Sequence, residues 1–161
     1  MKRKLGIIAE CVDGEDSVIS LERVAAAGFK STFTGRYDLP SVEKLVAKCE
    51  RLGLNMEFIH APFGGINNMW LTGDGYEAIY GGMCESIDSA AATGIGAIVA
   101  HVSSGWKAPE ICDEGLKRYD ALVEYAAKKN VVVAFENLRK VGNVAYFVDR
   151  YEGVDNVKFC Y

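Results

Sequence analysis

The sequence predicts an α/β fold in which a parallel sheet curls into a (β/α) barrel of the TIM type. Short apolar segments of strand length alternate with longer segments whose apolar residues recur at helical spacing, which is typical of consecutive βαβ units. The segment 131–135 is uninterrupted and β-branched at its start, as in a strand buried on both faces. Glu136 follows it directly, and His60 and His101 end two other apolar segments. Ligand-type side chains therefore stand at three strand ends, where barrel enzymes carry their chemistry.

The N-terminal half of the chain is expected to hold three strands and two helices. Apolar segments predict strands at 4–9, 29–34 and 54–60, and helical spacing between them predicts helices at 17–28 and 40–53. Asp16 or Ser17 is suited to cap the first helix, and Pro40 to begin the second. Gly28 and Gly53 stand where left-handed C-terminal caps belong.

The C-terminal half repeats this pattern with longer connections. Strands are expected at 97–102, 131–135 and 157–161, and helices at 74–92, 112–129 and 143–151. Two glycines, Gly81 and Gly82, lie inside the first of these helices and weaken it by about 1 kcal/mol each. Long loops at 61–70 and 103–109 follow the third and fourth strands, and loops of this length are more often functional than idle.

Two architectures fit this order of elements, an open doubly wound sheet and a closed eight-stranded barrel. The open sheet usually has a Gly-rich phosphate turn after its first strand, but residues 10–14 contain no G-x-G-x-x-G pattern. The barrel is favoured because Glu10, His60, His101 and Glu136 all fall at C-terminal strand ends. A complete barrel needs eight units and ~250 residues. We therefore expect a single domain that forms a truncated barrel, from the first strand to the sixth. Its open edges are expected either to associate with other copies or to be covered by additional chain in the natural gene product.

Composition narrows the classes of partner. The net charge of −4, without any long basic run, excludes the electrostatic surface to which nucleic acids and anionic membranes bind. The apolar segments are too short to span a bilayer, and residues 5–9 are short for a signal-peptide core. The five cysteines are scattered, with no C-x-x-C pair, as in reduced cytosolic proteins. We expect a cytoplasmic protein.

The three strand-end residues are expected to face the inside of the barrel together. Residues two apart on a strand face the same way, which groups Val132 and Ala134 with Glu136, Ala97 and Val99 with His101, and Met56 and Phe58 with His60. Glu57 is then left on the helix side, near Lys44 or Lys48. Imidazole and carboxylate ligands suit Zn, Mn, Fe or Co, and carboxylate with water suits Mg. The alternatives are an ion pair for Glu136, with Arg139 or a lysine, and a backbone carbonyl partner for each histidine.

Other residues near the strand ends are candidates for binding a substrate. Three aromatic residues of the long loops either enclose a small sugar or anchor the loops: Phe63, Trp70 and Trp106. Arg36 and Arg139 follow strand ends and suit a phosphate or carboxylate, or else a surface ion pair. Glu10 is placed to accept sugar hydroxyl groups.

Three short motifs resemble those of a known superfamily. The segments His60-Ala-Pro-Phe63, His101-Val-Ser-Ser-Gly105 and Phe135-Glu-Asn-Leu138 are similar to the ends of strands three, four and five in the xylose isomerase-like barrels. That group contains sugar-phosphate isomerases and epimerases, inosose dehydratases and abasic-site nucleases of the endonuclease IV type. The resemblance covers the whole chain in order and spacing, and it implies a divalent metal (Zn, Mn, Mg or Co) at the top of the barrel.

The resemblance also implies roles for individual residues. In the isomerase and epimerase branch, the glutamate that ends strand five is a metal ligand and often an acid–base residue, which assigns both roles to Glu136. In the endonuclease branch, the histidines of strands three and four are ligands as well, which adds His60 and His101; in the sugar branch they more often line the substrate pocket. The family continues with an Asp-x-x-His motif, a further histidine and a second glutamate, none of which lies within residues 1–161.

The expected function is that of a metal-dependent isomerase or epimerase, which moves a proton next to the carbonyl of a sugar or sugar phosphate. One of the two carboxylates that this reaction uses is missing, so the chain by itself is expected to be inactive. One alternative is a phosphodiester hydrolase of the endonuclease IV type, and another is a non-catalytic fragment or binding module.

Overall fold

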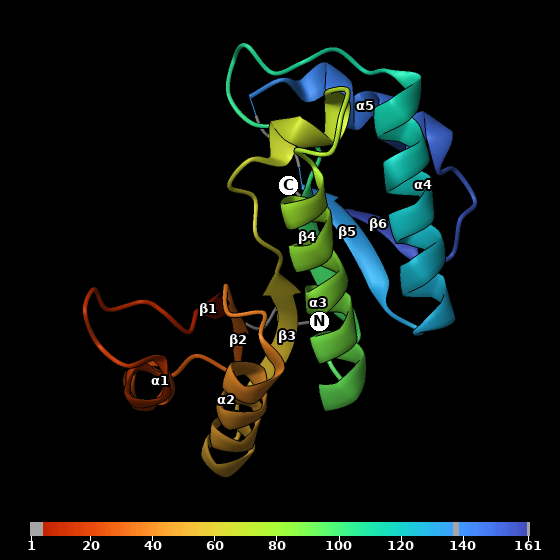
Figure 1. Ribbon diagram of the computed structural model, residues 1–161. Helices are drawn as coiled ribbons and strands as arrows, with labels where there is room; N and C mark the ends of the chain where they lie inside the picture. The colour runs from red at the N-terminus through yellow and green to blue at the C-terminus, as the bar shows by residue number, and fades with distance from the viewer. Residues whose placement is uncertain (1–4, 137–138, 161) are drawn as a thin grey trace.

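In the described part of the chain, six strands alternate with helices (Figure 1), as the sequence predicts. The computed structural model describes residues 5–136 and 139–160. The strands are β1 (Gly6–Ile8), β2 (Ser31–Thr34), β3 (Asn55–His60), β4 (Ala97–His101), β5 (Val132–Glu136) and β6 (Val157–Cys160). The helices are α1 (Ser17–Ala26), α2 (Leu39–Leu52), α3 (Glu77–Thr93), α4 (Asp113–Lys128) and α5 (Val141–Arg150), with a 3₁₀ helix, η1 (Ile66–Trp70). None of the helices in this part of the chain is long and apolar enough to span a membrane.

The strands form one sheet in sequence order, β1-β2-β3-β4-β5-β6, and every neighbouring pair is parallel. A doubly wound sheet reverses its strand order at a switch point, whereas this sheet adds each strand on the same side. Because parallel crossovers are right-handed, an unreversed order puts all the helices on one face and leaves the C-terminal strand ends at one edge. This is the winding of a TIM barrel over its first six strands, and it confirms the predicted fold class.

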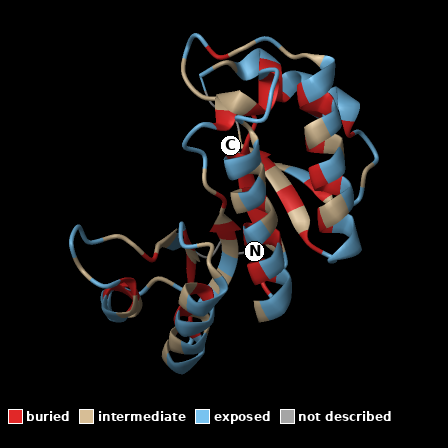
Figure 2. Cartoon of the chain, in the orientation of Figure 1, coloured by how far each residue is buried: buried red, intermediate tan, exposed pale blue. Residues whose placement is uncertain are grey.

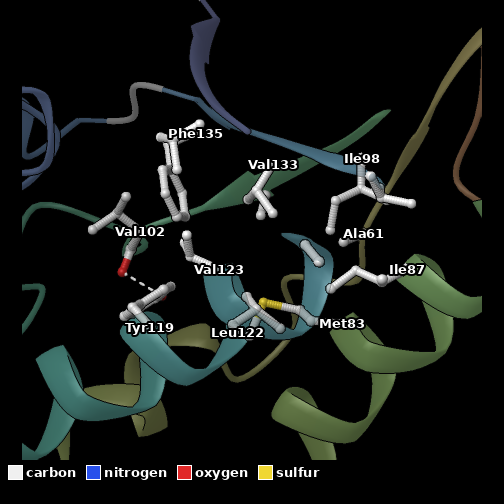
Figure 3. Packing of buried hydrophobic residues seen from close by; sticks show 14 of the residues in the cluster. Ala61, Met83, Ile87, Ile98, Val102, Tyr119, Leu122, Val123, Val133 and Phe135 are labelled. Carbon is white, nitrogen blue, oxygen red and sulfur yellow. Dashed lines mark hydrogen bonds between the residues drawn. The ribbon is translucent and has the colours of Figure 1, made fainter. Parts of the chain in front are cut away.

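The hydrophobic core lies between the sheet and the helices. Figure 2 shows the buried residues on the sides of the helices that face the sheet. In the larger cluster, strand residues point toward residues of α3 and α4 (Figure 3), among them Ile98, Val133, Phe135, Met83, Ile87, Tyr119 and Leu122. A smaller cluster packs α1 and α2 against the sheet near β1. The strands follow the predicted alternation in β5, where Val133 and Phe135 are fully buried and Glu136 lies on the other face.

A bulge in β3 changes the predicted facing of that strand. Thr32 pairs with Met56 but Thr34 pairs with Ile59, so two steps along β2 correspond to three steps along β3. Met56 therefore packs on the helix side, and the prediction that it faces the barrel interior is wrong. Alternation resumes after the bulge. Ile59 is buried among the helices, and His60 faces the interior as expected.

The bulge also explains the position of Glu57. This residue was expected on the helix side beside Lys44 or Lys48, but its Oε1 accepts a hydrogen bond of 2.6 Å from Ser31 Oγ. Phe58 stacks on Phe33 with ring centroids 4.6 Å apart. Both residues of the bulge thus lie on the interior face, which corrects the prediction for Glu57.

Helix ends follow local capping chemistry. Asp16 caps α1, and Gly53 ends α2 in the left-handed conformation, as predicted. The N-cap of α2 is Asp38, whose carboxylate accepts from the Ser41 backbone N–H. The long loop 61–70 was expected to be irregular but ends in η1.

Two helix glycines have packing roles. A Cβ on Gly82 would lie 2.8 Å from Pro62 Cγ, so this glycine lets the loop after β3 pack closely on α3. A Cβ on Gly115 of α4 would lie 2.1 Å from the Trp70 ring. The ring of Trp70 therefore occupies the space that any larger residue at position 115 would need.

Replacing Gly115 by Ala is expected to destabilise the protein by about 1–3 kcal/mol, because Trp70 and α4 must separate. Gly81→Ala is the matched control, since no atom lies within 4 Å of its added Cβ and alanine favours the helix by up to about 1 kcal/mol. Urea unfolding of both variants measures the difference. Equal stability of the two variants would contradict the packing described for Trp70.

Candidate metal centre

Three side chains meet at the C-terminal edge of the sheet. His60 Nε2 lies 3.0 Å from His101 Nε2, and Glu136 Oε2 lies 3.4 Å from the first and 3.1 Å from the second. Each side chain can offer one ligand atom to a common point, and these atoms lie within 4.8 Å of one another. The structure thus brings together the three residues that the sequence predicted as metal ligands.

Sheet register produces this convergence. His101 on β4 is paired with Glu136 on β5, so their side chains leave the same face side by side. His60 is the last residue of β3 and pairs with Val99, two residues before His101 on the same face. Since neighbouring strands lie about 4.8 Å apart, side chains of ordinary length meet above their ends.

The environment of the two imidazoles prepares them as ligands. His101 is only 5% exposed, and burial is the main reason why its pKa lies below the usual value. The neighbouring His60 lowers the pKa further, and Glu136 opposes the shift. His60 Nδ1 lies 3.0 Å from the Ala61 carbonyl oxygen, which can only accept, so this nitrogen carries the proton. The lone pair of His60 Nε2 is then directed at the centre.

The donor set and its spacing fit a divalent cation. Ligand atoms about 2.1 Å from an ion lie about 3.0 Å apart in octahedral and about 3.4 Å apart in tetrahedral geometry, the range found among these three atoms. Two imidazoles with one carboxylate suit Zn, Mn or Co better than Mg, which prefers oxygen. The Nδ1 atom of His101 is buried and has no partner in the described part of the chain.

Backbone groups near the centre are held by side chains from other segments of the chain. The hydroxyl group of Tyr119 lies 3.1 Å and 2.9 Å from the carbonyl oxygens of His101 and Val102, between which it shares its proton. Asn67 and Ser104 bond reciprocally: the Asn67 amide donates to the Ser104 carbonyl at 2.9 Å and accepts from its N–H at 2.8 Å. The loops that follow the two histidines are therefore joined. Nothing in the sequence pointed to these contacts, because the partners are far apart along the chain.

Phe63 lies against both histidines. Its ring centroid is 4.8 Å from that of His101 and 5.7 Å from that of His60, and the residue is 49% exposed. Phe63 therefore shields the imidazoles from water on one side while it presents apolar surface to solvent.

Trp70 occupies a different place from the one expected. It is 4% exposed, packs against Tyr119 and Phe147, and donates from Nε1 to the Val102 carbonyl oxygen at 2.8 Å. Of the two roles considered for this residue, the position fits the loop anchor and not a wall of a sugar site. The ring of Trp70 fits into the core because Gly115 has no side chain in that space.

The other predicted residues lie outside the three-residue cluster. Glu10 accepts from Thr34 Oγ1 at 2.7 Å and from the Gly35 N–H at 3.1 Å, which holds it at the ends of β1 and β2. Trp106 is 75% exposed, and the guanidinium carbon of Arg139 lies 5.8 Å from the centre of its ring. Asn137 and Leu138 of the third motif lie outside the described residues.

A family model described as xylose isomerase-like TIM barrel matches residues 21–161. The chain belongs to this family. A comparison with curated proteins found no match. The solved structures that resemble this xylose isomerase-like barrel include a D-psicose 3-epimerase from Clostridium cellulolyticum H10 with D-tagatose, at 17% identity and a TM-score of 0.75. A xylose isomerase domain protein from Planctomyces limnophilus gives 17% and 0.71, and a 3-keto-D-glucoside 4-epimerase from E. coli gives 16% and 0.72.

These matches describe the fold. They cover 98%, 97% and 98% of this chain, and 62%, 62% and 67% of the epimerase from Clostridium, the Planctomyces protein and the E. coli epimerase. The chain thus spans less than two thirds of the first two relatives.

We expect the purified chain to bind one Zn²⁺ ion, with the affinity reduced at least about 100-fold in Glu136→Ala and in His101→Ala, because each change removes a ligand. Affinity should also fall in acid, where protons compete for imidazole, and because burial lowers the pKa of His101 this fall begins at a lower pH than for an ordinary imidazole. Calorimetric titration of the metal-free protein measures both effects. Glu10→Ala is the matched control and should bind normally. An unchanged Zn²⁺ affinity in Glu136→Ala would contradict the assignment of this metal centre.

Proposed function

We propose that the chain carries the metal centre of an isomerase or epimerase that moves a proton on the carbon next to the carbonyl of a sugar or sugar phosphate. The observation that supports this most is the position of Glu136, a carboxylate that shares one point at the barrel mouth with two imidazoles. Proton transfer next to a carbonyl needs a carboxylate of this kind within reach of an electrophile. The likeness to solved sugar epimerases is consistent with the proposal.

We assign a separate role to each residue of the centre. A divalent ion, when bound, would polarise the substrate carbonyl and so acidify the neighbouring C–H group. His60 and His101 would hold that ion through Nε2. The carbonyl oxygen of Ala61 fixes the ring of His60, and the Tyr119 hydroxyl group fixes the backbone of His101. Glu136 directs Oε2 at both imidazoles, and its second oxygen is the one to which we assign the proton.

The centre contains a single carboxylate, and this limits what it does alone. Inversion at carbon requires proton removal on one face and delivery on the other, hence two acid–base groups. In the described part of the chain, Glu10 is engaged by Thr34 and Gly35 and is not a member of the cluster. A single base removes a proton and returns one to the same face, which exchanges hydrogen without changing configuration.

The Zn- or Mn-loaded chain is therefore expected to exchange the proton next to the carbonyl of a ketohexose with D₂O, without forming an epimer. Proton NMR measures the exchange, and chromatography of the sugar checks for an epimer. Glu136→Gln should abolish exchange, and Glu50→Gln, a change of an exposed glutamate on α2, should retain it. Metal and sugar binding without exchange would instead assign the chain as a binding module.

A second function is favoured by one observation: both histidines share the centre with Glu136, which is the ligand pattern implied for the endonuclease IV branch. That branch hydrolyses phosphodiesters at abasic sites. The overall charge of −4 argues against it, because DNA binding draws most of its affinity from basic side chains.

The Zn-loaded chain is expected to leave a duplex with one abasic site intact, because a sequence with a net charge of −4 and no long basic run offers little positive charge to the phosphates. Gel electrophoresis of an end-labelled duplex measures cleavage. Strand cleavage that is lost in both His60→Ala and Glu136→Gln would contradict this expectation and favour the hydrolase.

A further inference from the structure

We propose that the substrate of this site is a sugar that carries an anionic group, a phosphate ester or a carboxylate, and that Arg139 binds that group. The inference rests on the proposed function and names its substrate class. Arg139 lies three residues after Glu136, on the connection that leaves the C-terminal end of β5. Trp106 lies five residues after His101, on the connection that leaves β4.

The two connections contact each other through Arg139 and Trp106. The guanidinium carbon of Arg139 is 5.8 Å from the centre of the Trp106 ring, and Trp106 is 75% exposed. An aromatic face attracts a guanidinium group and limits its freedom, but leaves its N–H donors available. The pair thus presents a cation and a large apolar surface to solvent, at the edge of the sheet where the metal centre lies.

Arg139 forms no ion pair with a carboxylate of the described residues. Within the described residues, the lysines and arginines in ion pairs with carboxylates are Arg23, Lys48, Lys129, Lys140 and Arg150. Arg118 donates to four backbone carbonyl oxygens. Arg139 makes no ion pair with any of these residues' carboxylate partners or with another described carboxylate, so its positive charge is not neutralised there.

Hydrogen bonds also anchor the two connections to each other. Lys140 Nζ donates to the carbonyl oxygens of residues 108–109 and to Glu110 Oε1, and the amide of Asn143 donates to the carbonyl oxygen of Pro109. Figure 1 shows the connection from β4 to α4 passing next to the start of α5. These bonds join the segments that carry Trp106 and Arg139. They also pair Lys140 with Glu110, which leaves Arg139 as the unpaired cation of the connection from β5 to α5.

The chemistry of the guanidinium group indicates which class of ligand Arg139 binds. A guanidinium fork matches the oxygens of phosphate and carboxylate in a bidentate geometry, and a neutral sugar offers no equivalent partner. A protein with a net charge of −4 repels anions at long range, so an anionic substrate needs a local cation to bind. An arginine that only solubilises the surface would need neither the Trp106 ring nor anchored connections.

The test compares D-fructose 6-phosphate, D-fructose and D-gluconate as probes, each titrated calorimetrically into the Zn-loaded chain. We expect an anionic sugar to bind at least about fivefold more tightly than D-fructose, and the preferred anion separates phosphate from carboxylate recognition. Arg139→Ala should remove that preference, and Arg139→Lys should keep only part of it. Arg51→Ala is the matched control, an exposed arginine in the last turn of α2, and should bind like the unchanged chain.

Tryptophan fluorescence gives a second readout. The chain has two tryptophans, and Trp70 is buried, so an anion at Arg139 should change the emission of Trp106 in particular. Equal affinity for D-fructose and both anionic sugars, an unchanged preference in Arg139→Ala, or no binding of either anion at millimolar concentration would each overturn the inference. Exchange of D-fructose protons together with any of these results would leave the proposed function standing. Anion binding that depends on Arg139, without proton exchange, would support the role of Arg139 and contradict the proposed function.

Discussion

The crowding of two imidazole nitrogens and one carboxylate oxygen at the end of three neighbouring strands is the constraint on which the rest of the structure depends. These atoms lie 3.0–3.4 Å apart at the rim of an apolar sheet, where unpaired polar groups are costly. They meet only if β3, β4 and β5 keep their register. A slip of one residue in β5 would turn Glu136 into the helix-side core and bring Phe135 to the interior face.

The register is enforced from the opposite face of the sheet. Val133 and Phe135 are fully buried among the helices, and Ile59 and Ile98 are equally buried on the strands beside them. Burial of large aliphatic and aromatic side chains contributes about 1.5–3 kcal/mol each, so the core resists any slip. The helix layer also reaches the edge itself, since Tyr119 of α4 bonds to the backbone at the end of β4. One set of contacts thus stabilises the fold and places the ligands.

Much of this could be predicted from the sequence because it rests on local patterns. Alternating apolar segments give the strands and helices, and a charged residue after a buried strand marks Glu136. The bulge in β3 could not be predicted, because it depends on how Ser31 and Phe33 of the neighbouring strand receive Glu57 and Phe58. Trp70 was equally ambiguous, since only the space above Gly115, 45 positions further along, decides that its ring enters the core.

Charge arrangement links the centre to its surroundings. The protein is acidic overall, and several of its basic side chains are neutralised by ion pairs with carboxylates outside the three-residue cluster. At the mouth the balance is different: two uncharged imidazoles and one carboxylate would leave a divalent ion with a net positive charge, and Arg139 adds another nearby along the chain. A site of this composition attracts electron-rich oxygen atoms, such as the carbonyl, hydroxyl and acidic groups of a sugar derivative. The fold alone would allow many chemistries, and it is this local charge that narrows them.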